Sequence, residues 1–367
     1  MVGRHAEIAG AGFAGLAAAI ALRQRGWTVR IHEAERELRA FGAGIFIWEN
    51  GLRILKSLGA YDAAVTGAHE APLNQSRNER NETYYSIKFG PDRGTRMITM
   101  TRQHLFQALL TQAQKLGVDI ETGSEALGAE PEGILLAAKG RKHRADLVVG
   151  ADGVRSKIRD SLGQPVWREQ YEQGVIRLLV DRREDDLTPV DRDYVINFWS
   201  GRYRLMYVPC NQREVYLLLG AHKSDLAATA LPVRSEVYSE AFPFLAGILG
   251  RIGDRGRFDV YEAMKLTRWS VGRVAIVGDA AHSMPPTLGQ GAGSAMANAL
   301  SLAVALDQDP EIGEALAAWE SRERPLTEHT QNTSIDHAQN RVGSGPRTKW
   351  DDEALRTARY IPTGTSP

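Results

Sequence analysis

Three glycines near the N-terminus have the spacing that binds the pyrophosphate of a dinucleotide. Gly10, Gly12 and Gly15 follow a short run of alternating β-type residues and open a helix rich in alanine. This spacing lets a strand turn sharply into a helix, brings the backbone close to the phosphates and packs the helix on the sheet. The positive end of the helix then stabilises the phosphate charge.

Glu33 completes this pattern. It ends a second β-type run, Thr28–His32, and lies 18 residues after Gly15. A carboxylate about 20 residues after the glycines accepts hydrogen bonds from a ribose diol. A glycine cluster alone usually marks an ordinary turn, but the order strand, glycines, helix, strand and acid favours a nucleotide site. The acid also disfavours a 2′-phosphate on this ribose, so FAD and NAD both remain open here.

A second acid with a glycine-rich turn occurs in the last third of the chain. The buried-type run Val274–Val277 leads into Asp279, and a helix then extends to about Leu306. Two prolines and three glycines lie between them: Pro285, Pro286, Gly289, Gly291 and Gly293. In a flavin site, Asp279 would accept hydrogen bonds from ribityl hydroxyls. The helix N-terminus near Gly291 would face the negative charge on the pyrimidine side of a reduced flavin.

Four more residues suit the same ligand less specifically. Asp152 follows another buried-type run. Arg102 opens a helix, where its charge is unfavourable against the helix dipole, so it is either solvated or in contact with phosphate or ribityl oxygens. Gly44 allows close approach to a flat ligand, with a flexible loop as an equal alternative. His282 suits an orienting hydrogen bond better than general-base catalysis.

The elements that must position these residues indicate an α/β fold. Strands and helices alternate in the first part of the chain and again near its end, as in a Rossmann-like domain. The middle contains alternating or aromatic-rich runs between polar turns, typical of an antiparallel sheet. We expect a nucleotide-binding domain at 1–173 and 271–367, with a polar excursion at 70–95, an inserted antiparallel-sheet domain at 174–270, and C-terminal helices at 312–338 and 351–359.

Composition limits the partners. Lys plus Arg and Asp plus Glu both number 45, so no net charge attracts nucleic acid or an anionic membrane, and we expect small-molecule partners. Cys210 is the only cysteine, which excludes an internal disulfide and a cysteine-based metal site. The nine histidines show no paired metal spacing, so we expect no metal. No leader or long apolar run is evident, and we expect a cytoplasmic protein.

Taken together, three separated motifs resemble one family. They are GAGFAG with Glu33, GADG with Arg155, and the Gly278-Asp279 motif with its proline and glycine turn. The chain resembles the single-component FAD-dependent aromatic hydroxylases over nearly its whole length. Segments such as GADGVRSKIRDSLG and GDAAHSMPPTLGQGAGSAMANALSL are most similar to the branch that oxygenates hydroxypyridine carboxylates.

The resemblance implies a noncovalent FAD that NADH or NADPH reduces without a second nucleotide fold. Dioxygen would then form a flavin C4a-hydroperoxide that hydroxylates an activated ring, with ring opening in the pyridine branch. Asp152 would serve the pyrophosphate side and nicotinamide-nucleotide binding. The implied cofactor-binding residues are Gly10, Gly12, Ala14, Gly15, Glu33, Gly44, Arg102, Asp152, Asp279, Gly289, Gly291, Ala292 and Gly293.

The substrate side has less support from the residues themselves. By resemblance, Arg177 and Arg204 would pair with a substrate carboxylate or phenolate, and Tyr216 would bond the ring hydroxyl. Arginine suits this role because its planar fork matches a carboxylate and stays charged when desolvated. Without the resemblance, both arginines would be read as surface residues of a sheet. Tyr261 is as well suited to core packing, and Pro286 is placed at the ring edge.

Other functions remain open at this point. A hydroxylase of the same fold acting on a salicylate or hydroxybenzoate fits equally well, since both substrates carry a carboxylate and a hydroxyl. A flavin-dependent halogenase is disfavoured because its Trp-x-Trp-x-Ile-Pro motif is absent. A flavin reductase or sensor that never oxygenates is a less favoured third reading. The exact substrate, ring opening and the oligomeric state are left open.

Overall fold

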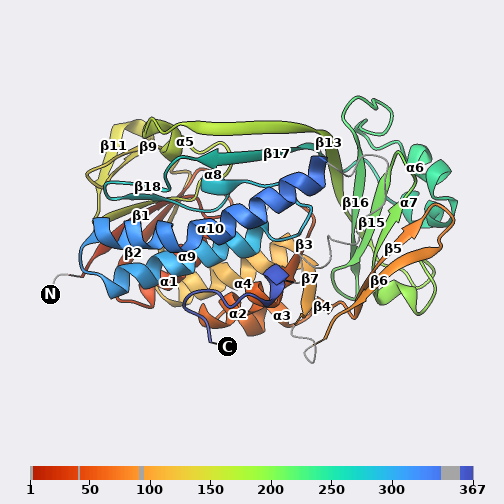
Figure 1. Ribbon diagram of the computed structural model, residues 1–367, viewed down its shortest axis with the longest axis horizontal. Coiled ribbons are helices and arrows are strands. Elements are labelled where there is room, and N and C mark those ends of the chain that lie inside the picture. Colours follow the sequence, from red (N-terminus) through yellow and green to blue (C-terminus); the bar gives the residue numbers. More distant parts are fainter. Residues whose placement is uncertain (1–2, 40–41, 91–94, 340–355, 367) are drawn as a thin grey trace.

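The computed structural model describes residues 3–39, 42–90, 95–339 and 356–366. It confirms the expected α/β fold, in which a parallel sheet with helices lies at one end of the molecule and an antiparallel-rich sheet at the other. The long strand β13 (Val166–Asp181) runs along the top of Figure 1 and connects the two ends. The nucleotide motifs and the predicted substrate residues therefore come from different sheets.

The first sheet is built on the glycine motif. Its strand order is β18 (Ser270–Val271), β19 (Val274–Ile276), β12 (Leu147–Gly150), β1 (His5–Ala9), β2 (Thr28–Glu33) and β8 (Asp119–Thr122). All neighbours pair in parallel except β18 and β19. The glycine turn, Glu33 and Asp279 all follow the carboxyl ends of these strands, where ligands bind in open α/β sheets.

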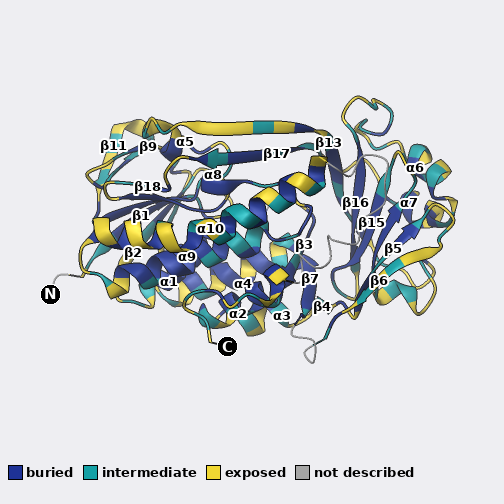
Figure 2. Ribbon diagram, viewed as in Figure 1, coloured by how far each residue is buried: buried dark blue, intermediate teal, exposed yellow. Residues whose placement is uncertain are grey.

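Helices cover one face of this sheet. Helix α1 (Phe13–Arg23) is buried at ten consecutive positions because it packs between the sheet and α9 (Gly291–Gln308). Its run of alanines suits this position, since small side chains allow helices to approach closely. Helix α10 (Ile312–Gln339) lies outside α9 (Figure 1), and its exposed face is visible in Figure 2.

A small antiparallel sheet lies beside the parallel sheet in Figure 1. Its order is β11 (Arg141–Arg144), β10 (Ile134–Ala137) and β9 (Ala126–Glu130), and all neighbours pair antiparallel. His143 of β11 contacts His32 of β2, with ring centroids 4.7 Å apart. The small sheet therefore packs against the face of the parallel sheet from which His32 projects.

The second large sheet has the order β17 (Phe258–Leu266), β13, β16 (Glu214–His222), β15 (Arg204–Pro209), β14 (Val195–Trp199), β5 (Leu73–Asn78) and β6 (Thr83–Lys88). Residues 73–88 lie in the segment expected to be only a polar excursion. They add two strands here because β5 pairs in parallel with β14. Polar β6 forms the exposed edge, which explains why it lacked an apolar pattern. Strands of this sheet thus also come from outside 174–270.

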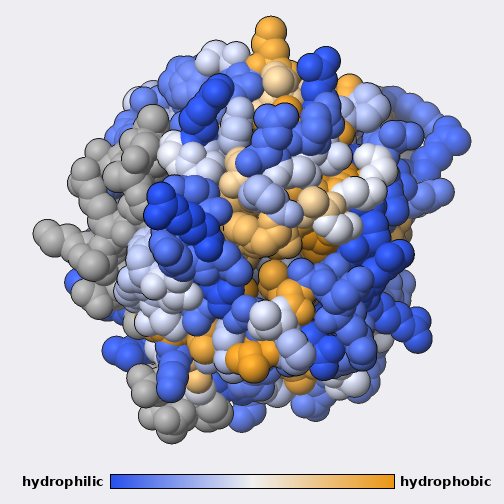
Figure 3. All heavy atoms as spheres, turned by 90° about the vertical axis from the view of Figure 1, so that its right-hand side faces the viewer, coloured by the Kyte–Doolittle hydropathy of each residue, from blue (hydrophilic) through white to orange (hydrophobic). Residues whose placement is uncertain are grey.

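The two faces of this sheet differ in chemistry. One face, with Phe198, Tyr207 and Leu217, is buried against α6 (Ser235–Ala241) and α7 (Ala246–Leu249). The opposite face packs with Ala43, Trp48 and Leu288 of the nucleotide-binding half. Figure 3 looks at the outer end of the sheet, where hydrophobic surface near the centre of the view is surrounded by mainly hydrophilic surface.

The remaining elements are a third sheet, which contacts β13, β15 and β16 of the second large sheet, and several helices. They are β3 (Gly44–Trp48), β7 (Met97–Thr101) and β4 (His69–Glu70) in one sheet, with helices α2 (Glu49–Ser57), α3 (Tyr61–Val65), α4 (Arg102–Lys115), α5 (Lys157–Ser161) and α8 (Asp279–His282). Residues 356–359 of the expected last helix are helical, and its first five lie outside the described residues. No helix in the described ranges is long and apolar enough to cross a membrane.

Candidate active site

The glycine turn has the geometry that a dinucleotide requires. Gly10 has φ +94°, and a Cβ there would lie 2.6 Å from the Ala151 oxygen. A Cβ on Gly15 would lie 1.9 Å from the Gly10 oxygen, so both positions need glycine for the fold itself. A Cβ on Gly12 would meet nothing within 4 Å, so its backbone is open to a ligand. The turn therefore fits a pyrophosphate at Gly12.

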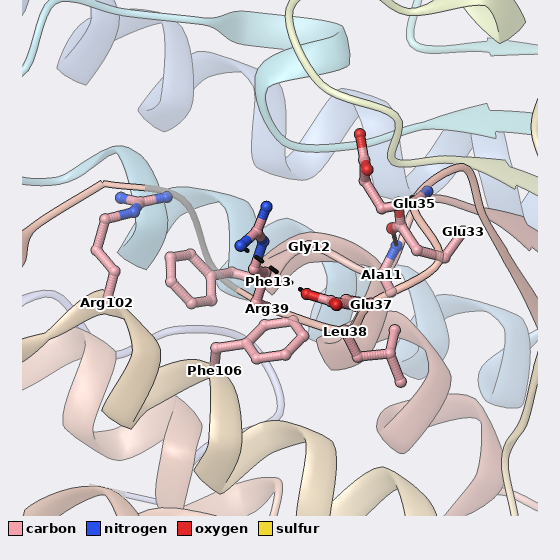
Figure 4. A pocket seen from close by; sticks show the side chains of 10 residues that line it. All are labelled: Ala11, Gly12, Phe13, Glu33, Glu35, Glu37, Leu38, Arg39, Arg102 and Phe106. Carbon is pink, nitrogen blue, oxygen red and sulfur yellow. Dashed lines mark hydrogen bonds and ion pairs between the residues drawn. The ribbon is translucent and has the colours of Figure 1, made fainter. Parts of the chain in front are cut away.

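Glu33 is held at the same place by backbone amides. The Ala11 N–H donates to Glu33 Oε2 at 2.8 Å, and the Glu35 N–H donates to Oε1 at 2.9 Å. These bonds fix the carboxylate beside the glycine turn and leave further lone pairs for a ribose diol. Figure 4 shows Glu33 and Ala11 joined at one side of the pocket.

The pocket next to Glu33 combines charged and apolar walls. Phe13 and Phe106 lie between Arg102 at one end and Leu38 at the other (Figure 4). Apolar side chains of this kind can pack against a flat base. Arg102, the first residue of α4, lies with its guanidinium 4.8 Å from the centre of the Phe13 ring.

Arg102, Asp279 and Arg177 are brought together although they are far apart in sequence. Desolvation lowers the pKa of Arg102, while Asp279 acts to raise it. Desolvation likewise raises the pKa of Asp279, and Arg102 and Arg177 act against that shift. Asp279 keeps solvent-exposed surface, so its side chain remains accessible to a ligand. The predicted cofactor and substrate residues therefore share one electrostatic environment.

Asp152 and Ala14 mainly support the fold around this site. Asp152 accepts hydrogen bonds from the Ser156 hydroxyl at 2.5 Å and the Lys157 N–H at 2.8 Å, which holds the start of α5. A Cβ on Gly278 would lie 2.8 Å from Ala14 Cβ, so these two residues bring α1 against the Asp279 turn. Direct contacts of Asp152 and Ala14 with the cofactor remain predictions.

The turn before α9 is fixed by residues of β3 and α2. Trp48 Nε1 donates to the Leu288 oxygen at 3.1 Å, and Gly289 has φ +65°. Asn50 Nδ2 donates to Gln290 Oε1 at 3.1 Å, while the buried Gln290 Nε2 has no hydrogen-bond partner among the described residues. Gly291, Ala292 and Gly293 form the first turn of α9, with Pro286 exposed just before it. Sequence reasoning missed Asn50 and Gln290, since an amide pair has no periodic signal.

Three predicted substrate residues lie on one face of the second sheet. Arg177 is opposite Leu218 and Arg204 is opposite Gly220 in the strand register. Residues 216, 218 and 220 alternate along β16 and therefore share a face. Tyr216 belongs to the same buried cluster as Trp48 and Leu288, so this face points toward the nucleotide-binding half. Tyr261 is buried in that cluster as well.

The two arginines differ in their partners. Arg177 Nη1 lies 2.9 Å from Asp259 Oδ2 and forms an ion pair. Arg204 donates to Asn197 Oδ1 from Nε at 3.1 Å and from Nη2 at 2.6 Å, and it lies 5.1 Å over the Trp199 ring. Within the described ranges, no carboxylate lies at ion-pair distance from Arg204. Its charge is therefore available to an anionic ligand.

Tyr216 stands between this sheet and Gly44. A Cβ on Gly44 would lie 2.5 Å from the Tyr216 ring, so glycine permits the close approach of β3 to β16. Desolvation raises the pKa of Tyr216, and Arg177 and Arg204 act against the rise. The Tyr216 hydroxyl has no hydrogen-bond partner among the residues that the structure describes. It remains protonated at neutral pH and can donate to a ligand.

His282 does not have the surroundings of a general base. It is buried, its Nε2 accepts from Asn298 Nδ2 at 2.9 Å, and its ring packs on Trp269 at 5.2 Å. Burial lowers the pKa of His282 to about 4, so the imidazole is neutral near pH 7. These contacts agree with an orienting role.

Comparison with known proteins identifies the family. The family model described as an FAD binding domain matches residues 5–316, most of the chain. The chain belongs to this family. Its glycine turn, Glu33 and pocket fit FAD, which supplies oxidation–reduction and oxygen chemistry when it is bound.

Relatives narrow the chemistry of this flavoprotein. A putative 2-heptyl-3-hydroxy-4(1H)-quinolone synthase of Rhodococcus erythropolis is 40% identical over 99% of this chain and 98% of the relative. Among solved structures, the tetrameric form of 2-methyl-3-hydroxypyridine-5-carboxylic acid oxygenase is 44% identical in sequence. It matches with a TM-score of 0.93 and covers 100% of this chain and 99% of the other.

A more distant relative, 6-hydroxynicotinate 3-monooxygenase of Pseudomonas fluorescens, is 28% identical over 92% of each chain. These similarities confirm the resemblance to the single-component FAD-dependent hydroxylases. This flavoprotein is an FAD-dependent aromatic-ring monooxygenase.

Proposed function

We propose that this flavoprotein uses NADH or NADPH and dioxygen to hydroxylate a small hydroxylated aromatic acid, specifically a hydroxypyridine carboxylate. The proposal is carried by two groups that share one sheet face. Arg204 has no carboxylate partner in the described ranges, and the Tyr216 hydroxyl has no hydrogen-bond partner there. A ring acid with a hydroxyl group offers an anion for the first and an acceptor for the second.

The remaining residues of this face orient that substrate. Asn197 fixes the Arg204 guanidinium through two hydrogen bonds, so less side-chain freedom is lost on binding. Arg177 keeps its ion pair with Asp259 and adds positive potential near Asp279 and Tyr216. The apolar side chains around Tyr216 exclude water from the ring.

The flavin residues position the cofactor beside this face. We propose that Gly12, Glu33 and Arg102 hold the dinucleotide part, that Asp279 accepts from the ribityl chain, and that the start of α9 faces the pyrimidine edge. The buried Gln290 amide group, whose Nε2 has no partner within the described ranges, lies at the same helix start and adds a hydrogen-bond donor there. This arrangement stabilises negative charge on the reduced ring.

Two other substrates are consistent with the same fold. Relatives about 40% identical are named for the synthesis of a 2-heptyl-3-hydroxy-4(1H)-quinolone, which favours an alkylquinolone as the second candidate. Salicylates and hydroxybenzoates share the carboxylate and hydroxyl of the first. The quinolone ring lacks a carboxylate. Its binding should therefore depend less on the charge of Arg204 than the binding of the ring acids does.

The test compares how candidate substrates affect flavin reduction. The purified FAD-loaded protein is mixed anaerobically with NADH or NADPH, alone or with 2-methyl-3-hydroxypyridine-5-carboxylate, salicylate or a 2-alkyl-4-quinolone, and flavin absorbance is followed. We expect the pyridine acid to accelerate reduction most. Acceleration by the quinolone alone, or by salicylate alone, would move the substrate to that class. No reduction by either nucleotide would contradict the proposed electron donor.

A further inference from the structure

The layer between the parallel sheet and the small β9–β11 sheet contains a buried cluster that the flavin site does not use. Glu7 lies on β1, His32 on β2 and His143 on β11. Ala9 is opposite His32 in the register, so Glu7 and His32 project from the same face of the sheet. Apolar Ala6, Ile8 and Ile31 occupy the other face.

The three side chains are close enough to share one ion. One ligand atom from each lies within 4.8 Å of the other two. His32 Nε2 is 2.8 Å from Glu7 Oε2, and His143 Nδ1 is 4.0 Å from Glu7 Oε1. Zinc binds imidazole nitrogen and carboxylate oxygen at about 2.0–2.2 Å, so small rotations of these side chains would complete a three-ligand site.

Burial makes this cluster unusual for a set of polar groups. Glu7 is 2% exposed and His32 is 1% exposed. His143 Nε2 is buried and has no hydrogen-bond partner in the part of the chain that the structure describes. Because Glu7 and His32 are shielded from water, their electrostatic interactions with a bound cation would be strong.

Residues around the cluster orient its side chains through hydrogen bonds, as residues around a metal site orient the metal ligands. His32 Nδ1 lies 2.8 Å from Ser124 Oγ, which fixes the ring and leaves Nε2 directed at Glu7. Arg141 donates to the same hydroxyl and also to Glu121. His5 Nε2 lies 2.9 Å from the other Glu7 oxygen, Oε1, and its side chain is partly exposed, so the cluster is linked to the surface on this side.

Burial and hydrogen bonding act in opposite directions on the carboxyl group of this cluster. Burial acts to raise the pKa of Glu7, but hydrogen bonds from His32 and His5 outweigh it and lower the pKa overall. Burial and the nearby His32 lower the pKa of His143.

We propose that Glu7, His32 and His143 form a binding site for a divalent transition-metal ion of the zinc type. Two imidazoles and one carboxylate form a ligand set that binds such ions in preference to calcium or magnesium. The ion would cross-link β11 to β1 and β2. The His32 oxygen accepts from the Gly10 N–H at 2.8 Å, and Glu33 follows directly, so this cross-link would stabilise the strand ends that carry the FAD-binding turn.

The test measures zinc binding by the FAD-loaded protein without a polyhistidine tag. Protein freed of metals with a chelator is dialysed against zinc chloride, and bound zinc is counted by mass spectrometry. We expect one equivalent in the wild type and a loss of most of it in Glu7→Gln and His143→Ala. His222→Ala, which removes a partly exposed histidine at the end of β16, should keep the full equivalent.

The Tm and the X-ray absorption spectrum test the same site even if a variant folds poorly. Zinc should raise the Tm of the wild type but not of His143→Ala, and X-ray absorption of the zinc-loaded wild type should show two imidazole ligands. A wild type that binds no zinc would overturn the proposal. So would a folded His143→Ala variant that retains one equivalent, because the ion would then lie elsewhere.

Discussion

Arg204 donates two hydrogen bonds to the side-chain oxygen of Asn197, and within the described ranges it has no acidic partner. An amide oxygen orients a guanidinium without neutralising it. Arg177 on the same sheet face forms an ion pair with Asp259 at 2.9 Å, a carboxylate that it shares with Arg257. This difference assigns anion recognition to Arg204 and a supporting role to Arg177.

Replacing Arg204 should weaken substrate binding and leave FAD in place. Arg204→Ala removes a charge-assisted hydrogen bond of about 1.5–3 kcal/mol, or roughly 10-fold to 100-fold in Kd. The measurement is titration of the flavin spectrum with a hydroxypyridine carboxylate. Arg202→Ala, which removes an exposed arginine two positions away, is the matched control. An unchanged Kd in Arg204→Ala would remove this residue from the substrate site.

Asn197→Asp tests the same idea with almost no change of shape. The new carboxylate would form an ion pair with Arg204 and compete with an anionic substrate. We expect the KM for a ring acid to rise about tenfold or more, whereas a neutral quinolone should be affected less. Asn197→Ser, which keeps a neutral acceptor, should resemble the wild type more closely. Equal KM values for a ring acid in Asn197→Asp and wild type would contradict anion binding at Arg204.

Glu33 and Glu35 should differ in their effect on FAD affinity. Glu33 is tied to the glycine turn through the Ala11 N–H, whereas Glu35 is exposed at the rim of the same pocket. Glu33→Ala should weaken FAD binding by about 10-fold or more, as expected for loss of hydrogen bonds to a carboxylate. Glu35→Ala should change it less. Release of FAD is followed by its fluorescence, and a fully loaded Glu33→Ala protein would refute the ribose assignment.

Alanine substitutions at Gly12 and Gly15 should have different effects on FAD binding and on the stability of the apoprotein. A Cβ at position 15 would lie 1.9 Å from the Gly10 oxygen, so Gly15→Ala should lower the Tm even of the apoprotein. A Cβ at position 12 meets no protein atom within 4 Å, so Gly12→Ala should fold normally and bind FAD weakly. A destabilised Gly12→Ala apoprotein would show that this residue serves the fold instead.

His282 should make the protein sensitive to acid. Burial lowers its native pKa to about 4, whereas the unfolded value is about 6.5. Between these values the unfolded chain binds more protons, so stability is lost as pH falls through this window. Going from about pH 7.5 to about pH 5 should cost roughly 2 kcal/mol through this group. Denaturant unfolding at the two pH values should show a smaller loss in His282→Gln, and an equal loss would contradict this account.

The local motifs were predictable because their function depends on short stretches of backbone. Gly10, Gly15 and Glu33 meet through one strand, turn and helix, so their spacing in the sequence is also their geometry. Asp279 could be found for the same reason, since it follows a buried strand directly.

Contacts between distant strands could not be predicted in this way. The ion pair of Arg177 with Asp259 joins β13 to β17, and the bond of Arg204 to Asn197 joins β15 to β14. Both depend on strand register, which a single sequence does not specify. The strands in 73–88 were missed because their polar residues suit a sheet edge as well as a loop. The Glu7, His32 and His143 cluster likewise arises from three separate strands.

Transfer of an oxygen atom from dioxygen to the ring tests the central claim most directly. The FAD-loaded protein is supplied with NADH or NADPH, 2-methyl-3-hydroxypyridine-5-carboxylate and dioxygen labelled with a heavy oxygen isotope, and the products are identified by mass spectrometry. The account predicts that the wild type places heavy oxygen in a hydroxylated or ring-opened product. The Arg204→Ala variant, at an acid concentration too low for it to bind, should form no labelled product. Consumption of the nucleotide with only hydrogen peroxide formed, for this acid, salicylate and an alkylquinolone alike, would contradict it.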